Sequence, residues 1–138
     1  MKIEPAWLRD FAMRYSAAWC SKDPAQVAAF YSPNGSLSVN GTIPAVGRSA
    51  ITEIAQGFIT AFPDMIVTMD NVVIQGDRVV HHWTLTGANK GPGGTGRRIC
   101  ISGFEEWRVG DDGLIAESLG HFDEASYQSQ LQHGVGES

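Results

Sequence analysis

The sequence predicts an α+β fold in which a cone-shaped, strongly curved antiparallel sheet packs on three N-terminal helices. Two observations predict it. Up to Phe62, most apolar residues recur at helical spacing, whereas from Met65 onward they recur with a period of two between turn-forming segments. Consecutive hairpins form an antiparallel meander, and helices that precede a sheet must cover one of its faces.

The three expected helices have recognisable boundaries. Residues 5–20 carry a broad apolar stripe and begin with Pro5, which suits a first helical turn. Asp23 is a plausible N-cap for a short second helix that starts at Pro24. Residues 48–62 form the third helix, which ends before Pro63 because proline disfavours helical backbone in the residue before it.

The strands are separated by glycine-containing turns and loops. A turn at residues 32–35 leads into a short strand at residues 36–40, and a loop follows to residue 47. Four longer strands are expected at residues 65–75, 78–86, 97–109 and 114–122. A final helix is expected from Asp123 to about Leu131. With no repeat or linker visible, one domain spans residues 1–138.

The charge pattern argues against several classes of partner. The formal net charge is −5, and Arg97-Arg98 is the only adjacent basic pair, so we expect neither nucleic acid nor a membrane as a partner. We expect no secretion signal, because the N-terminal residues form no apolar h-region, and no membrane span, because no apolar stretch approaches roughly 20 residues. Cys20 and Cys100 lack metal-binding spacing, and we expect buried, reduced thiols in a cytoplasmic protein.

Three ordered stretches carry a family resemblance: Gly47-Arg48-Ser49 with a helix ending Phe62-Pro63-Asp64; Gly76-Asp77-Arg78-Val79-Val80 through Trp83 to Thr86-Gly87; and Asp112-Gly113-Leu114-Ile115-Ala116-Glu117 through Phe122-Asp123 to Gln130-Leu131. In this order the chain resembles the SnoaL-like polyketide cyclases of the nuclear-transport-factor-2-like superfamily. The resemblance implies a deep pocket and usually a homodimer. Relatives include cyclases, isomerases, dehydratases, epoxide hydrolases and binding modules, so the fold alone does not decide the function.

Asp123 and His121 are the predicted catalytic residues. Asp123 stands at the position that resembles the general acid/base aspartate of the polyketide cyclases, although it also fits an N-cap that accepts a hydrogen bond from Ala125 or Ser126. His121 lies two residues earlier, so the period of a strand places it on the same face as Asp123. Both side chains are therefore expected in the pocket, or neither.

The adjacent residues His81 and His82 must point to opposite faces of their strand, which prevents them from sharing one metal ion. The period of the strand does not determine which of its two faces points inward, because Val79 and Val80 are both apolar. We favour the face of His82, which would place His82 near the pocket. No set of three or four convergent ligands can be assembled, so no metal is predicted. Further substrate-binding candidates are aromatic: Trp19, Tyr31, Phe58, Phe62, Trp83 and Phe104.

Two departures from the family pattern limit the inferred substrate. Asn89 stands where cyclase-like members often carry a histidine, and Leu119 stands where many relatives have tryptophan. The first hypothesis is an enzyme that transfers protons on an apolar, carbonyl-bearing small molecule without an organic cofactor, with polyketide cyclisation as its specific form. The alternatives are isomerase, dehydratase or epoxide-hydrolase chemistry, or a non-catalytic binding or assembly module.

Overall fold

A computed structural model describes residues 3–135, so the predicted domain of residues 1–138 includes termini outside the described part. The elements in chain order are α1 (Pro5–Cys20), α2 (Pro24–Ala28), β1 (Tyr31–Val39), β2 (Ala45–Val46), α3 (Arg48–Ala61), β3 (Ile66–Gln75), β4 (Arg78–Ala88), β5 (Arg98–Val109), β6 (Ile115–Phe122) and α4 (Glu124–His133). Among the described helices, none combines the length and the apolar character needed to cross a membrane.

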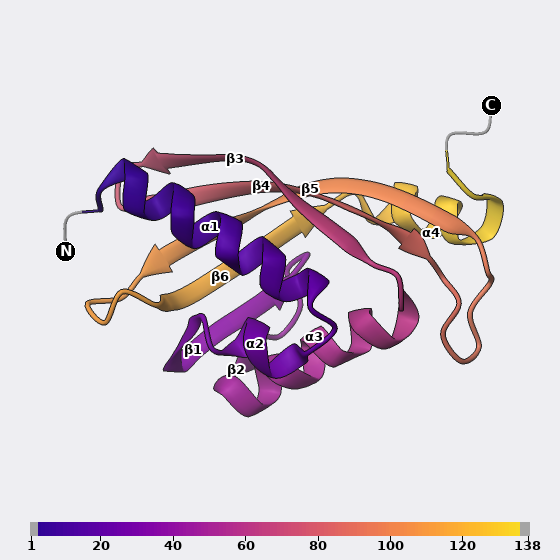
Figure 1. Ribbon diagram of the computed structural model, residues 1–138, viewed down its shortest axis with the longest axis horizontal. Coiled ribbons are helices and arrows are strands. Elements are labelled where there is room, and N and C mark those ends of the chain that lie inside the picture. Colours follow the sequence, from indigo (N-terminus) through magenta and orange to yellow (C-terminus); the bar gives the residue numbers. More distant parts are fainter. Residues whose placement is uncertain (1–2, 136–138) are drawn as a thin grey trace.

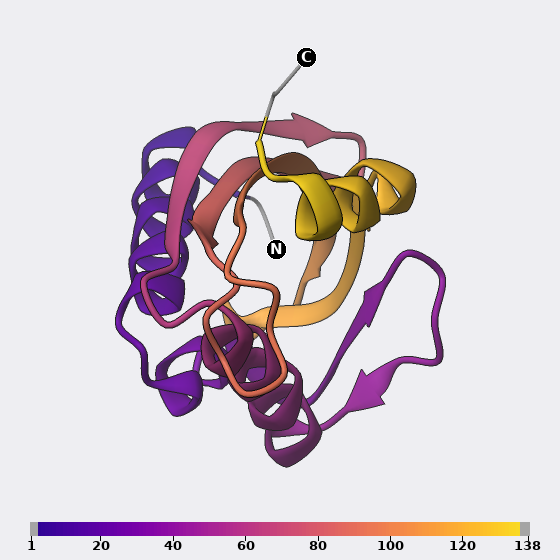
Figure 2. The same cartoon turned by 90° about the vertical axis from the view of Figure 1, so that its right-hand side faces the viewer.

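The strands form one curved sheet in the order β2-β1-β6-β5-β4-β3. β3 to β6 make the predicted antiparallel meander. Viewed along the long axis of the molecule, the sheet wraps around a central region, with α1 and α3 on its open side (Figures 1 and 2). The α+β fold with a curved sheet and three N-terminal helices is therefore confirmed.

The sheet has an inner face that packs on the helices and an outer face that does not. Strict alternation places Ile99, Ile101 and Trp107 of β5 inward, where each is almost completely buried. α1 crosses this inner face, and Phe11 of α1 packs edge-on against Trp107 at a ring-centroid distance of 5.7 Å. The core thus lies between the concave side of the sheet and the helices.

Local rules predicted the helix boundaries well. Asp23 caps α2, because its side chain accepts a hydrogen bond from the backbone N–H of Ala25 at 3.0 Å. Phe62 is the C-cap of α3, directly before Pro63. These expectations depended on residues within one turn of each other, and the structure confirms them.

The N-terminal strand differs from the expectation. The predicted turn at residues 32–35 is an irregularity inside β1, which begins at Tyr31 and pairs in parallel with β6, not antiparallel. Gly35 permits the close approach, since a Cβ at this position would lie 2.7 Å from the carbonyl oxygen of Ile115. The turn-forming residues do interrupt the regular strand. Because β1 pairs with β6 before and after them, they form a bulge within the strand and not a turn.

The two cysteines do not share one environment. Cys20 is partly buried, and its thiol lies within hydrogen-bond distance of both backbone polar groups of Val67. Cys100 is exposed on the outer face of β5, so the expectation that both thiols are buried is wrong for Cys100. The alternation of β5 explains this, because Ile99 and Ile101 occupy the inward positions on either side.

Candidate functional site

A cavity of about 70 Å³ lies between the inner face of the sheet and the helices α1 and α3. Its wall is mainly apolar and aromatic, and two titratable side chains, Glu105 and His81, belong to it. The complete lining is Trp19, Leu37, Val39, Ile54, Phe58, Val67, His81, Trp83, Leu85, Glu105, Gly120 and Phe122. A carboxyl and an imidazole in an apolar wall are the features of an acid/base site.

Glu105 is held by hydrogen bonds that are distributed unequally between its two oxygens. Oε1 accepts from Ser118 Oγ at 2.6 Å, from Trp107 Nε1 at 2.9 Å and from Tyr15 at 3.1 Å. Oε2 has one contact, with the Tyr15 hydroxyl at 3.3 Å. Oε1 is therefore an anchored oxygen, and Oε2 retains capacity to accept a further proton or hydrogen bond.

Two buried phenols extend this network. The Tyr31 hydroxyl lies 2.7 Å from that of Tyr15. Burial, together with the charge of Glu105, raises the pKa of both phenols well above their ordinary value, so they remain protonated and act as donors. Because the single Tyr15 proton is directed to Glu105, Tyr31 donates to the Tyr15 oxygen.

Burial of the Glu105 carboxyl raises its pKa, and the hydrogen bonds from Ser118, Trp107 and the tyrosines oppose that rise. The space for this side chain comes from the neighbouring strand, where Gly120 lies directly opposite in the β5–β6 register. A Cβ at Gly120 would lie 3.3 Å from the Ser38 carbonyl oxygen. A glycine at this position therefore keeps the wall beside Glu105 free of a side chain.

His81 lies on the same inner face, on β4. Its ring stacks on Trp107 at a centroid distance of 4.9 Å, and Nε2 lies 3.1 Å from the Ser16 hydroxyl. Burial lowers the pKa of His81 to about 4, so the imidazole is neutral near pH 7. Either neutral tautomer leaves Nδ1 buried without a hydrogen-bond partner among the described residues.

Trp83 follows His81 by two residues and presents a second unpaired nitrogen. Its Nε1 is buried and has no hydrogen-bond partner in the described part of the chain. The indole lies over Gly103 of β5, where a Cβ would come within 2.6 Å of the six-membered ring. Gly103 thus sets the position of the indole, and the wall contains two buried ring nitrogens that lack partners.

Two further cavities adjoin this inner chamber. An outer groove of about 390 Å³ is lined by Leu37, Val39, Thr42, Ile43, Glu53, Ile54, Gly57, Phe58, Ala61 and Tyr127. A small recess of about 20 Å³ lies on another side of the chamber, next to Trp83, Leu85 and Phe122, and Phe62 belongs to its wall. Phe58 borders all three spaces and is the one residue that they share.

The predicted aromatic residues are distributed over these spaces. Trp19, Phe58 and Trp83 line the inner chamber, and Phe62 lines the small recess. Tyr31 is completely buried in the hydrogen-bond network behind Glu105. Trp19, Phe58 and Trp83 thus border the inner chamber, whereas Phe62 borders only the small recess and Tyr31 borders none of the three spaces. The roles of all these residues in binding stay predictions.

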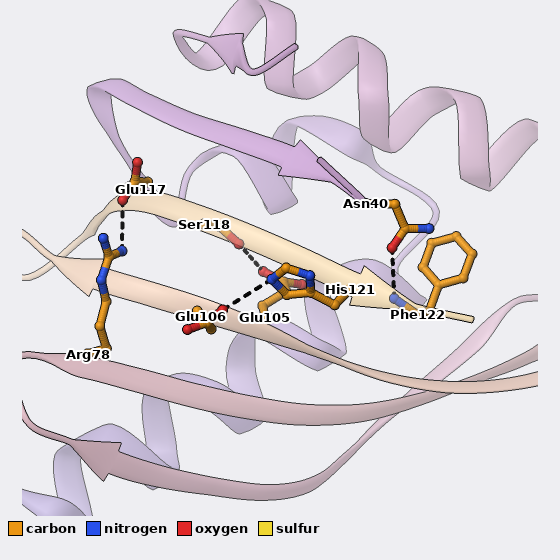
Figure 3. A network of polar contacts seen from close by, with 8 residues as sticks. All are labelled: Asn40, Arg78, Glu105, Glu106, Glu117, Ser118, His121 and Phe122. Carbon is orange, nitrogen blue, oxygen red and sulfur yellow. Dashed lines mark hydrogen bonds and ion pairs between the residues drawn. The ribbon is translucent and has the colours of Figure 1, made fainter. Parts of the chain in front are cut away.

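His82, Phe104 and His121 lie elsewhere, on the outer face of the sheet. Phe104 stacks on His121 at a ring-centroid distance of 4.8 Å and approaches His82 at 6.0 Å. Figure 3 shows His121 directed toward Glu106, 3.1 Å away, while Glu105 on the same strand contacts Ser118. The expected positions of these three residues in the pocket are corrected: they have the opposite parity to the inward residues of β4, β5 and β6.

Asp123 is the N-cap of α4. Its carboxylate is exposed and accepts a hydrogen bond from the backbone N–H of Ser126 at 3.1 Å, which confirms the capping alternative. Neither Asp123 nor His121 belongs to the wall of the three cavities. The sequence predicted that both side chains lie in the pocket or that neither does, and the second alternative is the observed one. These positions do not test whether either residue is catalytic.

Sequence reasoning missed Glu105 and His81, although the signal for both was present. In residues 98–109, the odd-numbered positions include Ile99, Ile101 and Trp107, while most even-numbered ones are polar or charged. Glu105 shares the apolar parity. In β4, the pairs Trp83/Thr84 and Leu85/Thr86 carry the same information and place the odd-numbered His81 inward. Val79 and Val80 obscured the pattern only at the start of the strand.

The glycine-rich segment between β4 and β5 is tied to the end of α3. Asn89 donates to the Ala61 carbonyl oxygen at 3.1 Å and accepts from the Thr95 N–H at 2.8 Å. Asn89 is also the residue that stands where cyclase-like members of the family often carry a histidine.

Within residues 3–135, no group of three or more His, Cys, Asp or Glu side chains is arranged to hold a metal ion.

Fold and site together define a class of protein: a small curved-sheet α+β domain with a titratable, largely apolar internal cavity. Residues 9–131 match the family model described as SnoaL-like polyketide cyclase, so the chain belongs to that family. No curated protein matches the sequence.

Solved structures with the same fold cover nearly the whole chain. A candidate SnoaL-like polyketide cyclase from Jannaschia sp. CCS1 is 18% identical, with a TM-score of 0.81 over 96% of this chain and 97% of its own. TsrD from Streptomyces laurentii is 22% identical, with a TM-score of 0.80 over 94% and 98%. TerC, co-crystallised with polyporic acid, is 16% identical, with a TM-score of 0.72 over 91% and 98%. At these identities the likeness concerns the fold.

Proposed function

We propose that this protein is an enzyme that transfers a proton on a small, mostly apolar, carbonyl-bearing molecule, with Glu105 as the general base. The observation that carries the proposal is the unequal bonding of the Glu105 carboxylate. Three donors hold Oε1, whereas Oε2 has one long contact. A base needs this combination of fixed orientation and one free oxygen.

The chemical step follows from these positions. Glu105 Oε2 takes a proton from the carbon next to a substrate carbonyl, and the electrons of the broken C–H bond form an enolate. In the cyclase form of the reaction, the enolate carbon attacks a second carbonyl of the same molecule and forms a C–C bond. The resulting alkoxide then takes the proton back from Glu105, which regenerates the carboxylate without a co-reactant.

The unpaired ring nitrogens support the stabilisation of an enolate. A buried donor without a partner costs free energy, and a substrate oxygen near Trp83 Nε1 would supply the missing acceptor. Neutral His81 offers Nδ1 for the same oxygen when that nitrogen carries the proton. Membership of the SnoaL-like polyketide cyclase family and the co-crystal of TerC with polyporic acid favour a small-molecule ligand.

Hydrogen–deuterium exchange tests the proposal without knowledge of the natural substrate. The probe is 2-tetralone, an apolar ketone, whose exchange in D₂O is followed by NMR with and without protein. The native chain is expected to accelerate exchange, and Glu105→Gln to reduce this acceleration by about 100-fold or more because an amide cannot accept the proton. Circular dichroism of Glu105→Gln controls for folding.

The same assay separates Glu105 from the residues predicted from the family pattern. Asp123→Asn preserves an N-capping side chain, and His121 lies on the outer face, so both Asp123→Asn and His121→Gln are expected to keep the native exchange rate. If Asp123→Asn abolishes exchange while Glu105→Gln retains it, Asp123 is the base. Equal rates with and without the native protein would contradict proton transfer on this class of ketone.

A further inference from the structure

We propose that the outer groove is a second binding subsite, which holds the apolar body of an elongated ligand whose reactive end enters the inner chamber past Phe58. This inference rests on the proposed function and adds a size class to the substrate. It follows from three independent features: the shared wall of the two spaces, the glycine at position 57, and the exposed side chain of Ile43.

The size of the inner chamber is the first step. Its volume is about 70 Å³. An apolar cavity of about 150 Å³ is known to accept benzene, so the inner chamber as it stands is too small for one aromatic ring. A carbonyl-bearing ligand that reaches Glu105 must therefore enlarge this space or leave most of its own volume outside.

The wall between the inner chamber and the outer groove is where the chamber could be enlarged and where the rest of a ligand could lie. Leu37, Val39, Ile54 and Phe58 border both the inner chamber and the outer groove. Phe58 also borders the small recess, and its ring contacts Trp19 edge-on at a centroid distance of 6.1 Å. Rotation of this one half-buried side chain about its Cα–Cβ bond would join the spaces, so Phe58 acts as a gate.

Gly57 is the second feature. It lies within α3, where glycine destabilises a helix relative to nearly every other residue. A Cβ at this position would have no heavy atom within 4 Å, so no close packing of the described chain requires a glycine. Gly57 does line the outer groove, and any larger side chain would occupy it. The absence of a side chain at residue 57 therefore keeps the outer groove open.

Ile43 is the third feature. Its side chain is 94% exposed, although it is large and apolar, and it lines the same groove. The turn before it is fixed, since Asn40 accepts a hydrogen bond from the Phe122 N–H at 2.9 Å (Figure 3) and donates to Glu124 at 3.2 Å. A ligand in the groove would remove this apolar side chain from water. Thr42 and Glu53 supply the polar rim of the groove.

Binding of N-phenyl-1-naphthylamine, a neutral fluorophore of three aromatic rings, tests the subsite by its fluorescence increase. The native chain is expected to bind this probe with a measurable Kd. Gly57→Leu should weaken binding at least 10-fold by filling the groove, and Ile43→Ser, on an exposed side chain that folding does not need, about threefold. Gln56→Leu is the matched control, because residue 56 lies on the same helix but outside the three cavity walls.

The outcomes distinguish this inference from the proposed function. Glu105→Gln should bind the probe with the native Kd even where it has lost ketone exchange. Phe58→Ala should bind the probe more tightly, since the gate is removed. Absence of probe binding by the native chain would overturn the subsite, and so would native Kd values for both Gly57→Leu and Ile43→Ser, whatever the exchange assay gives.

Discussion

Acidification is expected to destabilise the protein through His81. Burial first, and the charge of His82 second, lower the pKa of this imidazole from 6.5 to about 4, and the charge of Asp70 opposes the shift. On acidification, His81 of the unfolded chain therefore takes up a proton near pH 6.5, whereas His81 of the folded chain takes one up only near pH 4. The stability contributed by neutral His81 is complete above pH 6.5 and is lost as the pH falls through this window.

The magnitude follows from the width of the window. Each pH unit between 6.5 and about 4 changes the free energy of unfolding by about 1.4 kcal/mol, so His81 accounts for about 2 kcal/mol at pH 5 and about 3 kcal/mol at pH 4. Domains of this kind are stable by about 5–15 kcal/mol, so this loss is a substantial fraction of the total.

Urea denaturation followed by tryptophan fluorescence measures the effect at a series of pH values. His81→Phe keeps a ring to stack on Trp107 but cannot bind a proton, and the pH dependence of its stability should lack the His81 contribution. His121→Gln is the matched control on the exposed outer face and should retain that contribution. Parallel curves for the native chain and His81→Phe would refute the burial argument.

Three other predictions follow from described contacts. Burial raises the pKa of Glu105 above 4.5, so relative to Glu105→Gln the native chain should lose stability as the pH rises from 4.5 through that raised value, as measured by urea denaturation at each pH. Asn40→Ala should cost about 1–3 kcal/mol in the same assay, because it leaves the Phe122 N–H unpaired and places alanine at a φ of 51°. We propose that the homodimer implied by the family resemblance forms through the outer face around Phe104; Phe104→Lys should then yield monomers in sedimentation velocity, whereas a native chain that sediments as a monomer would contradict the homodimer.

The parts of the fold that the sequence predicted are those that depend on near neighbours. Pro5, Asp23 and Pro63 act within one helical turn, and the helix boundaries near them were confirmed. Each hairpin of the meander likewise joins strands that are adjacent in the chain. Such features need no knowledge of the rest of the molecule.

The remainder depended on contacts distant in sequence. The bulge at residues 32–35 exists because β1 pairs with β6, whose residues are about 80 positions away. Asp123 was predicted both as a cap and as a base. The cap needs only a backbone N–H three residues away, whereas the base needs a cavity, and the inner chamber is lined by residues of seven helices and strands. Glu105 was missed for a related reason. As neighbours on a strand, Glu105 and Glu106 face opposite ways and form no carboxylate pair, and only the parity of the whole strand shows that Glu105 is the inward one.

The parallel pairing of β1 with β6 also determines when this protein can finish folding. Residues 31–39 leave the ribosome about 80 residues before their partners at 115–122. Closing so long a loop is slow, because its entropy is lost before the contacts that repay it are made. We expect β1 to stay unpaired on this side until residues 115–122 have been made, so that the cavity, whose wall includes Gly120 and Phe122 of β6, cannot form earlier.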